Sequence, residues 1–259
     1  MVKNLSIHAE GLRVALARTG AEVRAAQRLR YDVFVRELGG DGPTALHGEG
    51  READHFDDHA RHLLLLDPKR PEWDRVVGAY RLLDRNGARA AGGFYSEGEF
   101  DLSPLLRSGR PLLELGRSCL HPDYRAGAGM MMLWQSLARL VMEEGIDLLF
   151  GTASFHGTDT AALAQPLSFL HHRHLAPESL RPVATGAEAA RMDLLDEQSL
   201  DRRAALREMP QLIRAYLRLG GVVGQGAWID RALGTTDVCV VLDIDAMDDR
   251  QRAFYEARP

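Results

Sequence analysis

The stretch RPLLELGRSCLHPDYRAGAGMMMLW, residues 110–134, decides how this sequence is interpreted. The apolar run 111–120 is typical of a strand, and residues 128–144 have the pattern of a helix. Gly127 and Gly129 precede the start of that helix. Unpaired N–H groups and the helix dipole attract anions there, and glycine lets a phosphate approach the backbone. The same residues also suit a plain strand-to-helix turn, because Gly-rich turns are common.

Two charged residues, Glu114 and Arg117, lie inside the apolar run. Residues three apart on a strand face opposite sides, so an ion pair is not implied unless a β-bulge intervenes. A charged pair in an apolar run needs a reason, because burying charge is costly. The pair therefore indicates either a functional site or an edge strand with solvated charges.

A second polar group precedes the strand-like run HLLLL, residues 62–66. Residues 39–54 are Gly-rich and polar, which indicates a loop long enough to act as a lid. Arg30, Asp54, Asp57 and Asp58 form a cluster that can hold an amino acid, with Arg for the carboxylate and Asp for ammonium groups. A solvated acidic loop is the alternative.

Composition bounds the class of protein. The chain has 259 residues, of which 45% are hydrophobic, and a formal net charge of −5, which gives no reason to expect nucleic-acid binding. Its two cysteines, Cys119 and Cys239, lie in apolar runs and are expected to be buried hydrophobes. The run HHRH, residues 171–174, has no evident partner for a metal site. Neither a secretory leader nor a membrane span is visible, so we expect a cytoplasmic protein with at most peripheral membrane contact.

The order of the expected elements indicates a mixed α/β fold. A helix is expected from about residue 21, capped by Thr19, and a kinked one near Pro166. Residues 188–198 can form another helix, and 209–221 a further one. The main strands are expected at residues 12–17, 62–66, 75–83, 111–120, 146–155 and 237–244. A single domain over residues 1–259 is the simplest interpretation.

The motifs LRYDVFVREL, EADHFDDHARHLLLLD, VVGAYRLL, LLELGRSCLHPDYRAG and IDLLFGTASFHGTD occur in this order. Together they resemble the ornithine–acyl-carrier-protein N-acyltransferases, a hemolysin-like branch of the GNAT acyltransferase superfamily. The resemblance covers about residues 12–245 and implies a GNAT-like domain, with a central mixed sheet flanked by helices and a C-terminal extension. The acyl-homoserine-lactone synthases are more distantly similar. They share the pattern of Arg30, Phe34, Asp54, Asp57, Arg81, Glu114 and Arg117.

The resemblance implies transfer of a 3-hydroxyacyl group from acyl carrier protein to ornithine, giving lyso-ornithine lipid in lipid biosynthesis, without a metal or a further cofactor. Glu114 and Arg117 are the expected catalytic residues, with Glu114 as base and strand N–H groups as oxyanion donors. The remaining expected site residues are Arg30, Phe34, Asp54, Asp57 and Arg81 for substrate and Arg125, Gly127 and Gly129 for the pantetheine phosphate. The arginines are expected to hold the substrate carboxylate or to order the acidic loop, and the aspartates to hold the ornithine ammonium.

Two departures from the related patterns keep alternatives open. Tyr124 stands where GNAT enzymes usually carry Gln or Arg, so coenzyme A is not assured as donor. The sequence RELGGDG replaces the segment in which lactone synthases usually have a Trp. The alternatives are another acceptor such as glutamine, a lactone synthase that uses S-adenosylmethionine, and a non-catalytic module that binds carrier protein or lipid. A basic docking face for the acidic carrier protein is expected at Arg107, Arg110 and Arg125.

Overall fold

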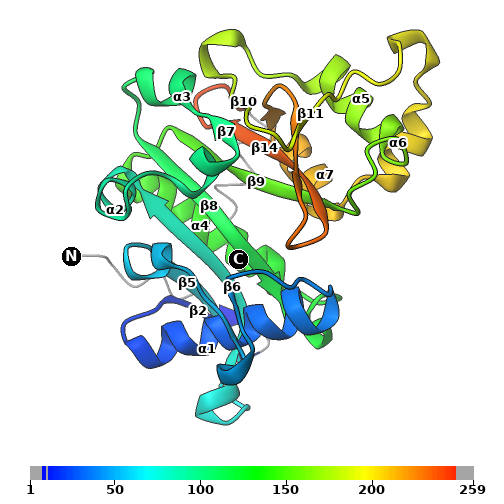
Figure 1. The fold of residues 1–259 in the computed structure, drawn as a ribbon. Helices are drawn as coiled ribbons and strands as arrows, with labels where there is room; N and C mark the ends of the chain where they lie inside the picture. Colours follow the sequence, from blue (N-terminus) through cyan, green and yellow to red (C-terminus); the bar gives the residue numbers. More distant parts are fainter. Residues whose placement is uncertain (1–7, 10, 249–259) are drawn as a thin grey trace. The chain divides into compact units, whose positions relative to one another are not determined.

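The structure is a computed structural model that describes residues 8, 9 and 11–248 (Figure 1). The N-terminal segment inspected for a leader and the last part of the expected C-terminal extension lie outside the described residues. The fold is mixed α/β, with sheet strands flanked by helices, which confirms the expected class. The chain divides into two compact units, one with residues up to 93 and 113–146, the other with residues 94–112 and 147–248. The single-domain interpretation stays a prediction.

The first unit is built on a run of antiparallel strands, in the order β1, β2, β5, β6 and β8. Their bounds are β1 His8–Ala9, β2 Leu12–Leu16, β5 Arg61–Leu66, β6 Val76–Asp84 and β8 Leu112–Leu120. The strands expected from apolar runs are therefore confirmed. β5 and β6 read as nearly continuous apolar runs because both of their faces are buried.

Two long helices cover opposite faces of these strands. α1 (Gly20–Arg30) begins at the expected Thr19 cap, whose hydroxyl accepts the N–H of Glu22, and continues as a π-helix, η1 (Tyr31–Glu37). It packs on a cluster that includes Ala79 and Cys119. α4 (Gly129–Glu144) ends at Gly145 in the left-handed region, as expected. The α1 face carries the candidate site.

The segment 39–54 is more ordered than the loop expected from its glycines. β3 (Ala45–Leu46) pairs with β4 (Arg51–Glu52), and a 3₁₀ turn, η2 (His47–Glu49), joins them. A further 3₁₀ turn, η3 (His55–Asp58), leads into β5. The expectation of a plain loop was wrong because a two-residue strand pair is too short to leave a periodic pattern.

The second unit holds an antiparallel group of strands with four helices. β14 (Thr235–Asp243) pairs with β9 (Leu148–His156), β13 (Ala227–Asp230) and β12 (Val222–Val223), and β13 pairs with β11 (Ala189–Ala190). β7 (Phe100–Asp101) pairs with β10 (Val183–Ala184). The helices are α3 Ser103–Arg107, α5 Ala164–His174, α6 Arg202–Glu208 and α7 Gln211–Arg218. α2 (Arg85–Ala91) belongs to the first unit.

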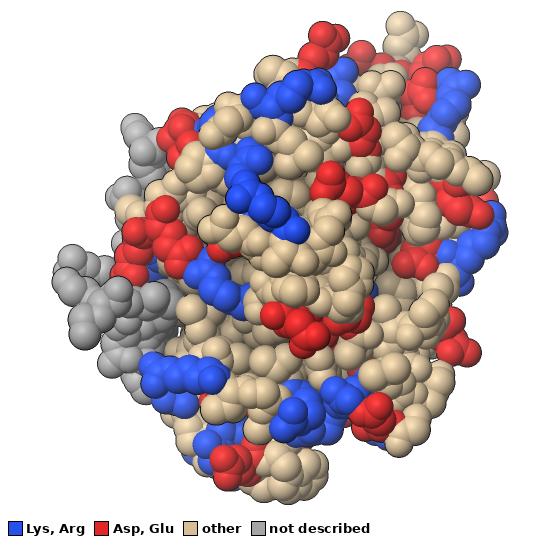
Figure 2. Space-filling view, turned by 60° about the vertical axis from the view of Figure 1, so that its left-hand side comes forward, with Lys and Arg blue, Asp and Glu red and all other residues tan. Residues whose placement is uncertain are grey.

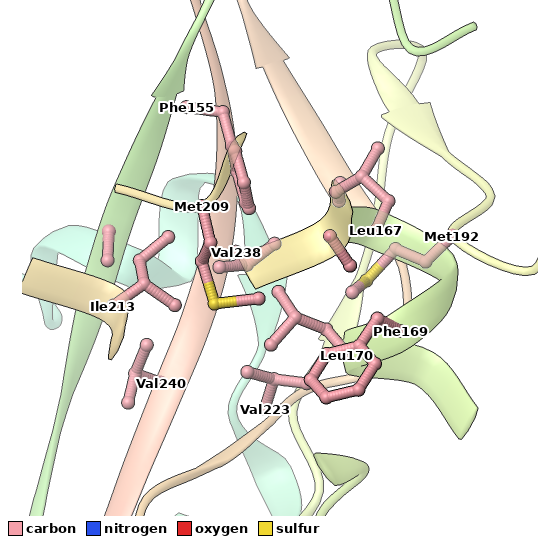
Figure 3. Packing of buried hydrophobic residues seen from close by; sticks show 13 residues of the cluster. Phe155, Leu167, Phe169, Leu170, Met192, Met209, Ile213, Val223, Val238 and Val240 are labelled. Atoms are coloured by element: carbon pink, nitrogen blue, oxygen red, sulfur yellow. The ribbon is translucent and has the colours of Figure 1, made fainter. Parts of the chain in front are cut away.

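Helices α5, α6 and α7 are held on β9 and β14 by one apolar cluster (Figure 3). Phe155, Leu170 and Ile213 point toward one another in this cluster, and each is at most 1% exposed. Met209 and Val238 also lie in it. Fully burying such a side chain stabilises a fold by about 1.5–3 kcal/mol, so the three helices have fixed positions on these two strands.

Two expectations in the second unit were wrong, and one helix was missed. Residues 188–198 contain β11 and a 3₁₀ turn, η8 (Glu197–Ser199), and no helix. Pro166 lies in the first turn of α5, where its missing N–H breaks no bond, so it does not kink the helix. α6 was not expected at all.

The other short 3₁₀ turns of the chain are η4 Glu72–Asp74, η5 Tyr95–Gly98, η6 Pro122–Tyr124 and η7 Glu178–Leu180.

Candidate active site

A β-bulge on β8 brings the two charged residues of this strand to the same face. On β6, Ala79 and Arg81 are two residues apart. Their partners on β8, Cys119 and Gly116, are three residues apart, so β8 has one extra residue here. The extra residue lies beside Arg117, the only non-glycine residue with a positive φ (50°) in the described part of the chain. Leu83 is opposite Glu114, so Glu114 shares the face of Arg81. From the sequence, an association of Glu114 with Arg117 required a β-bulge, and the structure has this bulge.

Beside the bulge, three arginines and three carboxylates alternate in a closed ring, which we call the charge ring. Each arginine contacts two carboxylates and each carboxylate contacts two arginines, through six ion pairs of 2.5–3.3 Å. In order around the ring the members are Arg30, Glu52, Arg117, Asp54, Arg81 and Asp57. The formal charges cancel, which is how such a group can be buried.

The members of the ring come from five parts of the chain, two of which are β6 with Arg81 and β8 with Arg117. Arg30 ends α1, Glu52 ends β4, and the two aspartates belong to the turn that leads into β5. Arg30 donates from Nη1 and Nη2 to the two carboxylate oxygens of Asp57, at 2.7 and 2.9 Å, and from Nε to Glu52 at 2.5 Å. Gln27 adds a hydrogen bond to Asp57 at 2.9 Å. The ring therefore fastens the segment 39–58 to α1 and to the bulge.

Burial and charge act against each other on the aspartates. Burial raises the pKa of Asp57, but the hydrogen bonds and positive charges of Arg30 and Arg81 outweigh it, so that this pKa lies well below its ordinary value. Burial likewise raises the pKa of Asp54, but Arg81 and Arg117 outweigh burial, so that this pKa also lies below its ordinary value. Both aspartates are therefore ionised at neutral pH.

The ring defines what its members do in the structure. The arginines were expected to hold the substrate carboxylate or to order the acidic loop. Their ion pairs within the ring order the acidic loop. The side chains of Arg117 and Asp54 are 9% and 10% exposed, whereas those of the other members are at most 3% exposed. Arg117 and Asp54 are therefore the edge of the ring nearest to solvent. Contact of the ring with a substrate stays a prediction.

The remaining substrate-site residues lie nearby in the first unit. Glu114 is 3% exposed and lies on the ring face of β8. Phe34 packs against the α1 cluster that holds Ala79 and Cys119. Burial raises the pKa of Cys119 to about 12, so this thiol is a small hydrophobe, as expected.

Sequence reasoning missed Glu52, which completes the ring, and His62, whose Nε2 lies 3.1 Å from the Asp57 carbonyl oxygen. Burial is the main cause that lowers the pKa of His62 below its ordinary value. The alternation of Glu52 with Asp54 was the one available signal, since residues two apart on an extended chain share a face.

The β8–α4 loop holds the residues expected to receive a phosphate. Within the described part of the chain, no side chain caps the first N–H groups of α4. A Cβ on Gly127 would meet nothing within 4 Å, whereas one on Gly129 would lie 2.9 Å from Cδ2 of Leu65. Arg125 forms a double ion pair with Glu37, at 2.5 and 2.6 Å. Tyr124 donates its hydroxyl to Asp67 at 2.6 Å.

An open cleft of about 340 Å³ lies between η1 and the end of β8. Leu29, Val33 and Pro122 supply apolar lining, and its other lining residues are Asp32, Arg36, Glu37 and His121. The cleft therefore combines apolar side chains with charged side chains of both signs.

Within the described residues no cluster of His, Cys, Asp and Glu has the arrangement of a metal site. The histidines of the HHRH run lie at the end of α5, and His172 contacts the carbonyl oxygen of Leu195 at 2.9 Å. Over the same residues, no helix combines the length and the apolar composition that crossing a bilayer requires.

Comparison with known proteins agrees with this geometry. Residues 29–135, which contain the charge ring and the β8–α4 loop, match the acetyltransferase (GNAT) domain family. The AHL synthase LasI superposes with a TM-score of 0.52 over 96% of each chain at 14% identity, which is a likeness of fold. Fold and site thus define a GNAT-type N-acyltransferase.

Two curated relatives narrow the class. The chain is 58% identical over 247 residues to the L-ornithine N(alpha)-acyltransferase of Rhodobacter capsulatus, covering 95% of both chains. It is 43% identical over 251 residues to that of Brucella abortus, covering 95% of this chain and 89% of the relative. The chain belongs to the L-ornithine N(alpha)-acyltransferase family, which confirms the expected resemblance.

Proposed function

We propose that this enzyme transfers a 3-hydroxyacyl group from acyl carrier protein to the α-amine of L-ornithine and so forms lyso-ornithine lipid. The observation that carries the proposal is the 58% identity, over 95% of both chains, to an L-ornithine N(alpha)-acyltransferase. The expected class, an N-acyltransferase that uses an acyl donor and an amino acid acceptor, agrees with the GNAT match.

The reaction needs no covalent enzyme intermediate. A neutral amine attacks the thioester carbonyl carbon, and the C–N bond forms as the carbonyl oxygen becomes an oxyanion. The C–S bond then breaks, and the pantetheine thiolate leaves and takes up a proton. The protein must align the two substrates, remove a proton from the amine and stabilise the oxyanion.

Glu114 is the residue that we assign to proton removal, directly or through one water. It is a buried carboxylate on the ring face of β8, three residues from the bulge. A bulge interrupts the hydrogen-bond ladder, so N–H groups of the strand become available as donors to an oxyanion. The presence of the bulge at Arg117 supports that assignment.

The donor in this proposal enters along β8 toward the β8–α4 loop, with the pantetheine phosphate at Arg125, Gly127 and Gly129. The uncapped start of a 16-residue helix favours an anion at this position. The proposal requires no cofactor beyond the carrier.

A peripheral membrane contact completes the proposal, because the product is an amphiphile. Trp73, in the turn between β5 and β6, is 68% exposed, and Arg28 donates to its carbonyl oxygen at 2.9 Å. Tryptophan favours the headgroup region of bilayers. Trp73→Ala is expected to weaken cosedimentation with phospholipid vesicles. Equal sedimentation of Trp73→Ala and wild type would exclude this turn as the contact.

Mass spectrometry of products tests the proposal. Purified enzyme is incubated with 3-hydroxyacyl carrier protein and, separately, with ornithine, glutamine, lysine or S-adenosylmethionine. An N-acyl product with ornithine is expected. A glutamine product would retain the mechanism and remove the ammonium role of Asp54 and Asp57, and a lactone would assign the chain to the signalling enzymes. If none of the acceptors gives a product, the alternative of a non-catalytic binding module would be favoured.

A further inference from the structure

The loop expected to receive the donor phosphate, residues 121–129, contains one Lys or Arg residue, Arg125. Its guanidinium is already engaged within the protein. Nη1 and Nη2 donate to the two carboxylate oxygens of Glu37, at 2.5 and 2.6 Å, and Nε donates to the carbonyl oxygen of Leu120 at 3.1 Å. A fork that binds a carboxylate through two parallel N–H groups binds a phosphate in the same way. Glu37 therefore occupies the position that an anionic group of a ligand would take on Arg125.

The Glu37–Arg125 pair is open to exchange with a ligand. Its side chains are 35% and 42% exposed, whereas those of the charge ring are at most 10% exposed. Glu37 is also the last residue of η1, and the negative end of a helix disfavours a carboxylate. The bond from Nε to Leu120 holds Arg125 at the loop independently of Glu37. An incoming anion can therefore displace Glu37 while Arg125 stays in place.

The position of this pair distinguishes it from the other surface ion pairs. Figure 2 shows basic and acidic side chains interspersed on one face of the protein, an arrangement in which such pairs are common, and most of them contribute little to stability. Glu37, however, lines the open cleft of about 340 Å³ together with His121 and Pro122 of the loop. Four residues after Arg125, α4 begins without a side-chain cap among the described residues. An anion that binds at this helix start therefore meets the Glu37 charge.

We infer that Glu37 is a specificity-determining residue that competes with the donor phosphate for Arg125. The inference rests on the proposed function, in which this loop receives the phosphate of a carrier-bound pantetheine. A carrier protein adds contacts of its own, so its single phosphodiester needs only weak binding at the loop. Coenzyme A has no carrier and presents a diphosphate and a further phosphate, each of which the Glu37 charge opposes. Glu37 therefore favours a carrier-bound donor over coenzyme A.

Calorimetry without turnover tests the competition. The measured quantity is the dissociation constant of pantetheine divided by that of 4′-phosphopantetheine, a ratio that isolates the contribution of the phosphate. Glu37→Gln keeps the size of the side chain and removes its charge. Glu144→Gln is the matched control, because Glu144 accepts from both Nη atoms of Arg61, at 2.5 and 2.8 Å, and the two side chains are 30% and 31% exposed. Glu144 ends α4, so it lies roughly 22 Å along the helix from Gly129.

Glu37→Gln is expected to raise this ratio about tenfold at low salt, because Arg125 then meets the phosphate without a competing charge. Glu144→Gln is expected to match wild type. The double variant Glu37→Gln/Arg125→Gln should lose the gain, since the gain depends on Arg125. In turnover assays, kcat/KM for 3-hydroxyacyl coenzyme A relative to that for 3-hydroxyacyl carrier protein should rise in Glu37→Gln.

An unchanged or lowered ratio in Glu37→Gln would overturn the inference, and a lowered ratio would identify Glu37 as a residue that positions Arg125. An equal rise in the Glu144→Gln control would overturn it as well, because it would indicate a general charge effect. So would a gain that persists in the double variant, or a donor preference in Glu37→Gln equal to that of wild type. The proposed function is judged separately, by formation of an N-acyl product from wild-type enzyme and acyl carrier protein.

Discussion

Replacing Arg30 by Met tests how much the fold depends on the charge ring. Methionine keeps the apolar stem but removes four hydrogen bonds, two to Asp57 and one each to the side chain and the carbonyl of Glu52. Among the described residues, Glu52 would then keep only Arg117 as an ion-pair partner, and Asp57 would keep Arg81 at 3.2 Å and the hydrogen bond from Gln27. These carboxylates are at most 2% exposed, so their charges stay buried with half of their arginine partners.

Removing one partner of a buried ion pair lowers the free energy of unfolding by about 3–5 kcal/mol. That is a large part of the 5–15 kcal/mol by which a domain is typically stable. The matched control is Arg36→Met, which removes an exposed pair with Asp32 at 2.6 Å and a contact with the Tyr31 ring. That loss is expected to be about 1 kcal/mol or less. Urea unfolding measures both free energies. A loss for Arg30→Met no larger than that of the control would refute the reasoning.

The same ring predicts how this difference depends on pH. The pKa values of Asp54 and Asp57 are depressed in the folded protein. Their stabilisation is therefore present in full above the unfolded value of about 4 and is lost as the pH falls toward the folded values. The Arg30→Met substitution removes part of the lowering of the Asp57 pKa. The free-energy difference between wild type and variant should accordingly shrink below about pH 4, and a constant difference would contradict the assignment.

Three further outcomes follow. Glu114→Gln should lower kcat by roughly 10²–10⁴-fold in folded protein, with little change in the KM for ornithine, and unchanged turnover would exclude Glu114 as base. Gly129→Ala should lower the free energy of unfolding by about 1–3 kcal/mol, because its Cβ would lie 2.9 Å from Leu65, whereas Gly127→Ala, in open space, should not; equal urea midpoints would contradict this. Cys119, with a pKa of about 12, should react with a thiol reagent only after denaturation, and rapid labelling of the native thiol would show exposure.

The strands and caps were predictable because their signals are local. The apolar runs at β5 and β6 and the Thr19 cap depend on neighbours in sequence, and all are present in the structure. The bulge at Arg117 is not local. Spacing alone puts Glu114 and Arg117 on opposite faces, and only the register with β6 shows the extra residue.

The charge ring was predictable only in part, for a similar reason. Five of its members were expected site residues, but nothing in the sequence says which carboxylate meets which arginine. Glu52 and Arg117 are 65 residues apart, and their contact depends on the β3–β4 pair, which has too few residues to leave a pattern. Sequence reasoning missed Glu52 because a short element is positioned by distant partners.

The ring also bears on how the acceptor is recognised. A buried ionic network is weak evidence for stability, since apolar replacements are often as stable, so its geometry needs another reason. Arg117 has a positive φ, which a non-glycine residue adopts at a cost of about 1–3 kcal/mol, and its contacts with Glu52 and Asp54 hold it there. An ornithine ammonium that reached Asp57 would have to displace two arginines in the interior. At Asp54, 10% exposed, it needs only to share a carboxylate. The ammonium role predicted for both aspartates is thus favoured at Asp54, with Asp57 keeping the ring in place.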